Sequence, residues 1–257
     1  MAMTRILHWT DMHMRRQLPG TAKDPFRLSR NIPALLERLK VRILSHAPDV
    51  LVLSGDLLDV PASVIKGNSP DERSLSDWLN DVKSDLNFIK EWLLSVGVPF
   101  VVVPGNNDDE RSFAEVFSGY GPPIDIAGLR FFCFWDRLSA DQQPIRDDVN
   151  AVLFQKAISG NEHECAQVHV QHYMIYPPVF AKNKHYQYTT SVDLKKSIDQ
   201  SGRVLAVLSG HYHPGTLVEG KVLHSGAPAF CEKPFSYRLY DLDEQLPTRV
   251  ETCILDN

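Results

Sequence analysis

Cysteine is scarce in this chain of 257 residues, and its four cysteines stand far apart. None belongs to a Cys-x-x-Cys pair, which redox and zinc motifs commonly use. Scattered single cysteines argue against a disulfide framework and favour the reduced thiols of a cytoplasmic protein. The four residues are Cys133, Cys165, Cys231 and Cys253.

Long apolar runs are also missing, because no stretch reaches the roughly 18 residues that a membrane span needs. Residues 1–5 lead directly into an apolar segment that carries candidate site residues, so loss of a cleaved leader would destroy the site. Positive charge is not in excess, since the formal net charge is −5, and this disfavours bulk binding of nucleic acid. We therefore expect that this protein has no membrane partner and does not bind nucleic acid in bulk.

Each of three short apolar runs rich in Val and Leu is followed by a glycine within one or two residues. The runs at 50–54, 100–103 and 204–208 lack the alternation of a half-exposed strand, so we expect strands buried on both faces. In open α/β sheets, sites form beyond the carboxyl ends of the strands, where glycine allows a sharp turn and a close approach. The polar residues that follow these glycines, and that we expect to converge, are Asp56, Asn106 and His211.

Two further strands supply more polar side chains at their ends. Residues 5–9 lead to Asp11 and His13, which are two positions apart and would share a face of an extended segment. Residues 168–171 lead to another histidine, and a second histidine follows two positions after His211. The seven candidate ligands, too many for one ion, are Asp11, His13, Asp56, Asn106, His172, His211 and His213.

This donor set combines imidazole, carboxylate and amide groups without thiolate, which suits Mn, Fe, Zn or Ni. Two cations roughly 3.5 to 4 Å apart, sharing one carboxylate, can clamp a phosphoryl group during hydrolysis of its ester. The sequence therefore predicts two divalent ions, with manganese as the first choice, and a phosphoester substrate. Because the ligands spread from residue 11 to residue 213, we expect a single domain over 1–257.

Five blocks follow one another along the chain: Asp11-x-His13, Gly55-Asp56-x-x-Asp59, Gly105-Asn106-Asn107-Asp108, His172 and Gly210-His211-x-His213. In this order they resemble the calcineurin-like metallophosphoesterase family. The resemblance implies an α/β fold, a four-layer α/β/β/α sandwich with two mixed β-sheets and a dimetal site at one edge. It also implies ligand roles: Asp11, His13 and His213 for the first metal, Asn106, His172 and His211 for the second, and Asp56 bridging both.

The third block departs from the family, which usually has Gly-Asn-His-Asp or Gly-Asn-His-Glu there. Asn107 takes the place of the histidine that protonates the leaving oxygen. An amide donates a hydrogen bond but does not titrate, so the roughly 10²- to 10⁴-fold of general acid catalysis is not available from it. Two residues are candidates for the missing acid. One is Asp108, for which the alternative role is to orient a ligand. The other is His224, in a segment that resembles the family's Asn-Pro-Gly-Ser turn. The alternative for His224 is a strand residue bonded to a backbone carbonyl.

The leading hypothesis is a phosphodiesterase that acts on a nucleotide-type diester or a nucleic-acid end. A hydroxide between the two metals would attack phosphorus. The alternatives are a phosphomonoesterase of the same family and a non-catalytic metal-binding scaffold. The residues expected to act in catalysis are Asp56, Asn106, Asn107, Asp108 and His224.

Apolar periodicity predicts four helices, at 32–44, 74–95, 149–158 and 191–201. Asn31 is expected to cap the first, Gly97 to end the second, and Asp147 or Asp148 to cap the third. After His213, a hairpin at 215–224 and strands at 236–242 and 249–255 are expected in the second sheet. Loops are predicted at 59–73, 111–128 and 176–190, and aromatic and basic residues of the last suit a wall that stacks a base.

Overall fold

Two β-sheets lie face to face at the centre of the computed structural model, which describes residues 3–22, 24–121, 123–179, 186–243 and 248–255. The strand order is β13-β12-β1-β2-β3 in the five-stranded sheet and β10-β11-β9-β8-β5-β4 in the six-stranded sheet. A separate short pair consists of β6 (Arg137–Leu138) and β7 (Pro144–Ile145). Both large sheets are mixed, as the resemblance implied.

The five-stranded sheet holds the first three strands of the chain in parallel. They are β1 (Thr4–Trp9), β2 (Val50–Ser54) and β3 (Phe100–Val103). At the other edge, β12 (Ser236–Leu242) pairs antiparallel with β1, and β13 (Arg249–Ile254) with β12. The prediction that these last two strands join the second sheet is therefore wrong. Side chains of β12 alternate between the outer core and the core between the sheets, as the edge of the first sheet requires.

The six-stranded sheet has a parallel centre and two antiparallel edge strands. The predicted hairpin is one edge, formed by β10 (Thr216–Val218) and β11 (Leu223–Gly226). The remaining strands are β4 (Ile124–Ile126), β5 (Leu129–Phe134), β8 (Gln167–Gln171) and β9 (Val204–Ser209).

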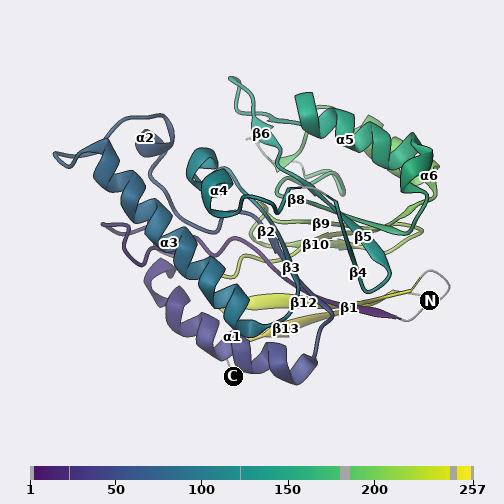
Figure 1. Cartoon of the computed structure of the whole chain (residues 1–257), viewed down its shortest axis with the longest axis horizontal. Coiled ribbons are helices and arrows are strands. Elements are labelled where there is room, and N and C mark those ends of the chain that lie inside the picture. The colour runs from purple at the N-terminus through teal and green to yellow at the C-terminus, as the bar shows by residue number, and fades with distance from the viewer. Residues whose placement is uncertain (1–2, 23, 122, 180–185, 244–247, 256–257) are drawn as a thin grey trace.

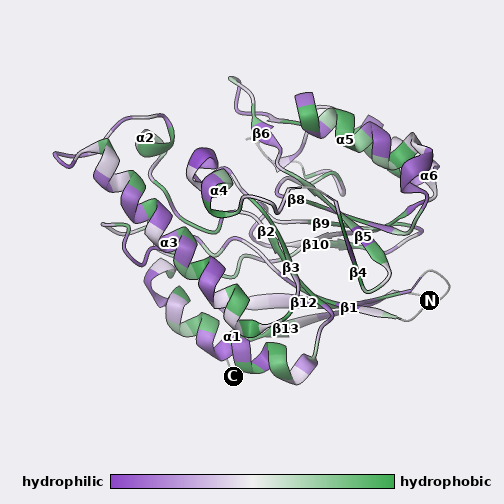
Figure 2. Cartoon of the chain, viewed as in Figure 1, coloured by the Kyte–Doolittle hydropathy of each residue, from purple (hydrophilic) through white to green (hydrophobic). Residues whose placement is uncertain are grey.

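Helices cover the outer face of each sheet (Figure 1). On the five-stranded sheet lie α1 (Ile32–His46) and α3 (Leu75–Val96), and on the six-stranded sheet α5 (Asp148–Ser159) and α6 (Ser191–Ser201). Hydrophobic and hydrophilic residues alternate along these helices in Figure 2, as expected of helices with one face on a sheet. The shorter helices are α2 (Ala62–Ile65), α4 (Glu110–Val116), η1 (Ser29–Asn31) and η2 (Asn161–His163). No helix in the described ranges combines the length and apolar character of a bilayer span.

Three hydrophobic clusters separate the layers. One lies between the helices α1 and α3 and the five-stranded sheet, one between the two sheets, and one between the six-stranded sheet and the helices α5 and α6. Three cores between successive layers make four layers, and the predicted α/β/β/α sandwich is confirmed.

The predicted helix ends hold only in part. Gly97 ends α3 in the left-handed conformation with φ of 76°, as expected. Asn31 and Asp147 stand before α1 and α5, but neither side chain caps its helix, so those predictions are wrong. Asn31 already has a helical backbone within η1, and the Asp147 carboxylate binds Arg137 at 2.6 Å instead.

Two predicted loops contain regular structure. Residues 111–128 carry most of α4 and all of β4, because the Asp109 side chain caps α4 and Phe113 buries its apolar face. The short α2 lies within 59–73. In the third loop, 176–190, residues 180–185 lie outside the described residues.

Candidate metal centre

All seven predicted ligands lie just beyond the carboxyl ends of strands, at one edge of the sandwich. The five-stranded sheet supplies those that follow β1, β2 and β3, and the six-stranded sheet supplies those that follow β8 and β9. The structure brings six of them into two groups, with the ligand atoms of each group within 4.8 Å of one another. These groups are Asp11, His13 and His213, and Asp56, His172 and His211.

Several of these residues have a left-handed backbone. The φ values are 52° at Asp11, 45° at His13, 50° at Asp56 and 68° at His211. The expectation of an extended Asp11–His13 segment is therefore wrong. Such strain in non-glycine residues persists where the surroundings hold it, and here Asp11 N donates to Gly55 O and His13 N to Asp56 O, at 3.0 and 2.9 Å. These two hydrogen bonds hold the segment that follows β1 against the segment that follows β2. The side chains of Asp11, His13 and Asp56 therefore lie close together.

Glycines are needed here for the close approach that the sequence predicted. A Cβ atom on Gly105 would lie 2.2 Å from Asp56 Oδ1, and one on Gly210 would lie 2.6 Å from Asp11 Oδ2. Any larger residue would displace the carboxylates on which both groups depend.

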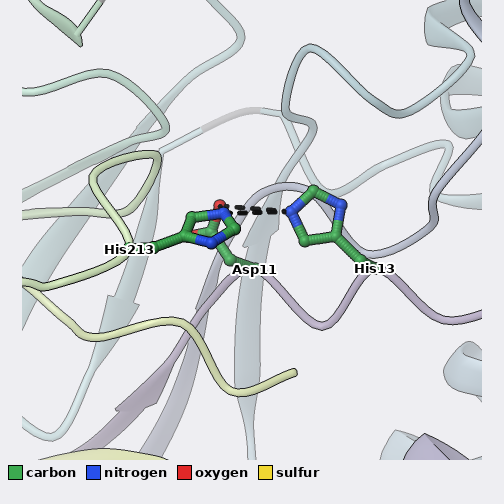
Figure 3. Close-up of side chains that lie close together, drawn as sticks. All are labelled: Asp11, His13 and His213. Carbon is green, nitrogen blue, oxygen red and sulfur yellow. Dashed lines mark hydrogen bonds and ion pairs between the residues drawn. The ribbon is translucent and has the colours of Figure 1, made fainter. Parts of the chain in front are cut away.

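The first group is an Asp11 carboxylate facing two imidazoles (Figure 3). Asp11 Oδ1 lies 3.7 Å from His13 Nε2 and 3.5 Å from His213 Nε2, and the two Nε2 atoms are 3.3 Å apart. The other oxygen, Oδ2, is occupied by hydrogen bonds from Thr10 Oγ1 at 2.8 Å and His211 N at 2.9 Å. One oxygen thus anchors the carboxylate, and the other faces the imidazoles.

The second group forms around His172. Its Nδ1 donates a hydrogen bond to Ser54 O at 2.8 Å, so Nε2 is the nitrogen available to a metal. That Nε2 lies 3.2 Å from Asn106 Oδ1 and 3.5 Å from Asp56 Oδ2, and the His211 ring centroid is 4.9 Å from that of His172. Asn106 therefore joins this group.

Asp56 stands between the two groups. Its Oδ2 lies 3.5 Å from His13 Nε2 in the first group and 3.5 Å from His172 Nε2 in the second. A carboxylate oxygen that faces both sets of donors has the position of a ligand shared by two ions.

These residues fit two divalent cations. Asp11 Oδ1 is buried and has no hydrogen-bond partner among the described residues, and an unpartnered buried carboxylate oxygen is costly unless a cation binds it. Burial opposes protonation of His213, but Asp11 and Glu232 outweigh it and raise its pKa to about 9. Burial likewise opposes protonation of His172, whose pKa Asp56 raises to about 9. These carboxylates attract positive charge to the positions where a metal would replace the protons.

Glu232 belongs to the site and was not predicted from the sequence. Its Oε1 is bonded to His213 Nδ1 at 2.5 Å, which turns Nε2 toward Asp11. Glu232 follows β11 in a turn without any recognisable motif, so no sequence signal marked it. Asp59 lies near the other imidazole of this group, with Oδ1 3.7 Å from His13 Nδ1, and it pairs with Arg15 and Arg27.

Glu232→Gln is expected to weaken metal binding by about 10- to 100-fold, because it removes the charge that orients His213 and raises its basicity. Mn²⁺ titration of the metal-free protein measures this. Glu219→Gln, which alters an exposed glutamate in the β10–β11 turn, serves as the control. Equal affinities of the two variants would contradict a role for Glu232 in orienting His213.

Asn107 lies against the shared carboxylate. Its backbone N donates to Asp56 Oδ1 and its Nδ2 to Asp56 Oδ2, both at 2.7 Å. Asp108 faces away, since its carboxylate accepts hydrogen bonds from the backbone N–H groups of Leu57, Leu58 and Gly105 at 2.8 to 3.1 Å. Burial and the nearby Asp56 raise the pKa of Asp108 to about 7. Asp108 therefore joins the two ligand-bearing turns and is not placed to protonate a leaving group.

His224 lies outside the centre, so its prediction as the catalytic acid is corrected. It pairs with Val207 within β9, whereas the ligand His211 lies beyond the end of that strand at Ser209. Its ring packs against Tyr176, with centroids 5.5 Å apart. Both ring nitrogens are buried without a partner among the described residues, so the alternative of a bond to a backbone carbonyl is wrong as well.

His224→Phe is expected to leave hydrolysis at pH 7 unchanged and to stabilise the protein in acid. Burial and then Lys195 lower the pKa of His224 to about 4. The unfolded state therefore binds more protons than the folded state between pH 6.5 and 4, and stability falls as the pH falls through this window. By linkage the loss at pH 5 is about 2 kcal/mol, and the variant avoids it. Denaturant unfolding at pH 7 and pH 5 gives the free energy of unfolding of wild type and variant. The same difference between the two proteins at both pH values would contradict the prediction.

A cavity of about 390 Å³ opens beside the two groups. Asp56, Asn106, Asn107, His211 and His213 line its floor. It provides room for a substrate in contact with both groups.

Comparisons with known proteins agree with this geometry. The family model "Calcineurin-like phosphoesterase" matches residues 4–215, whereas no curated protein shows significant sequence similarity to the chain.

Among solved structures, a dimetal phosphatase from Danio rerio has 12% identity and a TM-score of 0.68, with 96% of this chain and 98% of that chain covered. TT1561 of Thermus thermophilus has 13% identity and a TM-score of 0.60, with coverage of 99% and 100%. The calcineurin-like phosphoesterase YfkN of Bacillus subtilis has 11% identity and a TM-score of 0.56, with coverage of 99% and 91%. These three similarities show the fold, and the family model covers most of the chain: it belongs to the calcineurin-like phosphoesterase family.

Proposed function

We propose that this chain is a dimetal-dependent phosphodiesterase that acts on a nucleotide-type diester or a nucleic-acid end. The observation that carries the proposal is the position of Asp56 Oδ2, at 3.5 Å from a histidine of each ligand group. Asp56 would bridge the two cations. The residues that would hold one cation are Asp11, His13 and His213, and those that would hold the other are Asn106, His172 and His211.

Two cations bound there would supply an activated water at neutral pH and would neutralise charge on the phosphoryl group. Manganese is our first choice, and iron, zinc and nickel also suit imidazole combined with oxygen donors.

The amides of the third block bind the phosphoryl group in this proposal. Asn106 turns Oδ1 toward His172 and lines the cavity, which leaves Nδ2 to donate to a phosphoryl oxygen. Asn107 also lines the cavity and donates two hydrogen bonds to Asp56. Both amides stabilise growing negative charge without giving up a proton.

The preference for diesters rests on the leaving group. Asn107 does not titrate, Asp108 is held by three backbone N–H groups, and His224 lies away from the centre. A leaving oxygen that needs no strong acid is therefore the better substrate, and diesters with stabilised leaving groups meet that condition.

The test compares kcat/KM for bis-p-nitrophenyl phosphate and for alkyl phosphomonoesters in the Mn²⁺-loaded protein. We expect the diester to be preferred. A preference for the alkyl monoester would refute the proposal in favour of a phosphomonoesterase. Absence of hydrolysis with two metals bound would favour the scaffold alternative.

Asn107→His is expected to raise turnover by about 10-fold or more for substrates with poor leaving groups, because an imidazole of pKa near 6.5 would then lie beside the leaving oxygen. Activated aryl esters should change little. Asn68→His places a histidine on an exposed loop and is the control. An equal response of alkyl and aryl esters would contradict this assignment of position 107.

We also propose that residues 1–257 form one domain, because both sheets contribute to the same pair of ligand groups. A cytoplasmic location is proposed from the four cysteines, none of which forms a disulfide, as suits a reducing compartment.

A further inference from the structure

A large aromatic side chain stands exposed at the wall of the cavity. Phe26 lines the cavity and is 73% exposed, unlike the buried phenylalanines of the cores. Single exposed apolar residues are common on protein surfaces, so exposure alone indicates nothing. Two features of its surroundings, a fixed backbone and a neighbouring arginine, indicate that Phe26 contacts the substrate.

The backbone around Phe26 is held in place. Asp24 Oδ1 accepts a hydrogen bond from Phe26 N at 3.0 Å, and Asp24 O accepts one from Arg27 N at 3.1 Å. The next residue, Leu28, donates through its N to Cys231 O at 2.8 Å, beside the site residue Glu232. A turn fixed in this way presents Phe26 to the cavity at little further entropic cost on binding.

The segment before this turn is fixed as well. Arg30 donates to the carbonyls of Arg15, Arg16, Leu18 and Gly20 at 2.6 to 3.1 Å. Asp85 on α3 accepts from three successive backbone N–H groups, those of residues 16–18. The cavity wall formed by Asp24, Phe26 and Arg27 is thus supported by a fixed segment, residues 15–20.

Arg27 brings a positive charge to the same wall. Its Nη1 binds Asp59 Oδ1 at 3.1 Å, while Arg15 Nε binds Asp59 Oδ2 at 2.8 Å. Two guanidinium groups therefore share this one carboxylate. Arg27 lines the cavity, and its buried Nε has no hydrogen-bond partner among the described residues. A phosphate oxygen in the cavity would accept a charge-assisted hydrogen bond from this guanidinium group.

We infer that Phe26 and Arg27 form the subsite that selects the substrate, in which Arg27 contacts a non-bridging phosphate oxygen and Phe26 stacks on a flat ring of the esterified alcohol. The inference rests on the proposed function and names its substrate class, a phosphodiester of a nucleoside. Asp24 and Glu232 also line the cavity, and their charges disfavour a second anionic group such as a polyphosphate. Tyr186, another lining residue, adds a second aromatic surface.

The test uses two diesters with the same leaving group, thymidine 5′-(p-nitrophenyl phosphate) and methyl p-nitrophenyl phosphate. Phe26→Ala is expected to raise KM for the thymidine ester by about 5-fold or more, to leave kcat unchanged and to leave the methyl ester unaffected. Phe26→Trp should restore the low KM. Val192→Ala, which truncates an 80% exposed side chain on α6, is the control. Equal effects on both esters, or none, would overturn the role of Phe26.

Arg27→Gln is expected to lower kcat/KM for both esters, because both carry the phosphate, while two Mn²⁺ ions remain bound. Arg27 Nη1 also lies 3.4 Å from His13 Nδ1. Loss of metal in this variant would show that Arg27 supports His13 and would overturn its contact with substrate.

If wild type with two metals hydrolyses neither ester, the proposed function fails, and calorimetry with thymidine 5′-monophosphate then decides on the subsite. Tighter binding to wild type than to Phe26→Ala supports the subsite, and equal binding overturns it.

Discussion

Asp56→Asn is expected to lower kcat/KM for bis-p-nitrophenyl phosphate by about 10³-fold or more, because loss of the shared carboxylate removes several kcal/mol of metal-assisted stabilisation from the transition state. The Asp56 oxygens accept both hydrogen bonds of Asn107 and face both His13 and His172. An amide at this position offers a neutral oxygen, and the NH₂ group would face Asn107 or a ligand histidine. No other residue in the described ranges faces both groups in this way.

The control for this variant is Asp141→Asn, which removes the same charge from an exposed position before β7. Initial rates with saturating Mn²⁺ give the comparison, and the melting temperature shows that both variants are folded. Full activity of Asp56→Asn with two metals bound would refute the bridging role.

Removal of metal is expected to abolish hydrolysis, and titration of the chelated protein with Mn²⁺ should restore it at a ratio near two ions per chain. Because His213 and His172 have pKa values raised to about 9, ions must displace protons at neutral pH. Metal affinity should therefore fall as the pH falls below 9, and binding should release protons. Metal that binds only the folded state also raises the melting temperature.

Elemental analysis gives the ratio, and calorimetry in buffers of different ionisation enthalpy gives the protons released. Asp11→Asn is expected to weaken one site and spare the other, since Asp11 Oδ1 faces only the first group. A ratio that stays at one in wild type at saturation would refute the dimetal centre.

The site depends on how the two sheets are held together. His8 on β1 bonds Tyr240 Oη at 3.1 Å and Ser54 Oγ at 2.8 Å, and Tyr240 in turn bonds Ser225 Oγ on β11 at 2.7 Å. This buried chain of hydrogen bonds crosses from the five-stranded to the six-stranded sheet. It ends at Ser54, whose carbonyl orients His172, so the same residues join the sheets and position a ligand.

Local sequence was sufficient for most strands and for the four long helices, whereas the strands β4 to β7 and the short helices α2 and α4 were not predicted. Runs such as 50–54 are apolar without alternation because β2 is buried on both faces, and Gly97 marks the end of α3 because its φ of 76° suits glycine. The predictions failed where a side chain or a strand had more than one possible partner. Asp147 pairs with Arg137 instead of capping α5, and β12 pairs with β1 across more than 200 residues of sequence.

By itself, the sequence determined which seven polar side chains stand at strand ends, because a polar residue that closely follows a buried apolar run, at three of the five strands after a glycine, is a local feature. The family resemblance implied how these side chains group, and the contacts that bring them together are visible only in the tertiary structure. Contacts between distant segments produce the left-handed backbone at Asp11 and His13, the support of His213 by Glu232, and the pairing of His224 with Val207 in β9, away from the ligand groups. The position of Phe26 and Arg27 beside the cavity also depends on the tertiary structure, because it follows from a turn fixed by hydrogen bonds and not from periodicity. Spacing along a chain sets which face a side chain takes within one element, whereas the packing of two sheets sets which atoms meet.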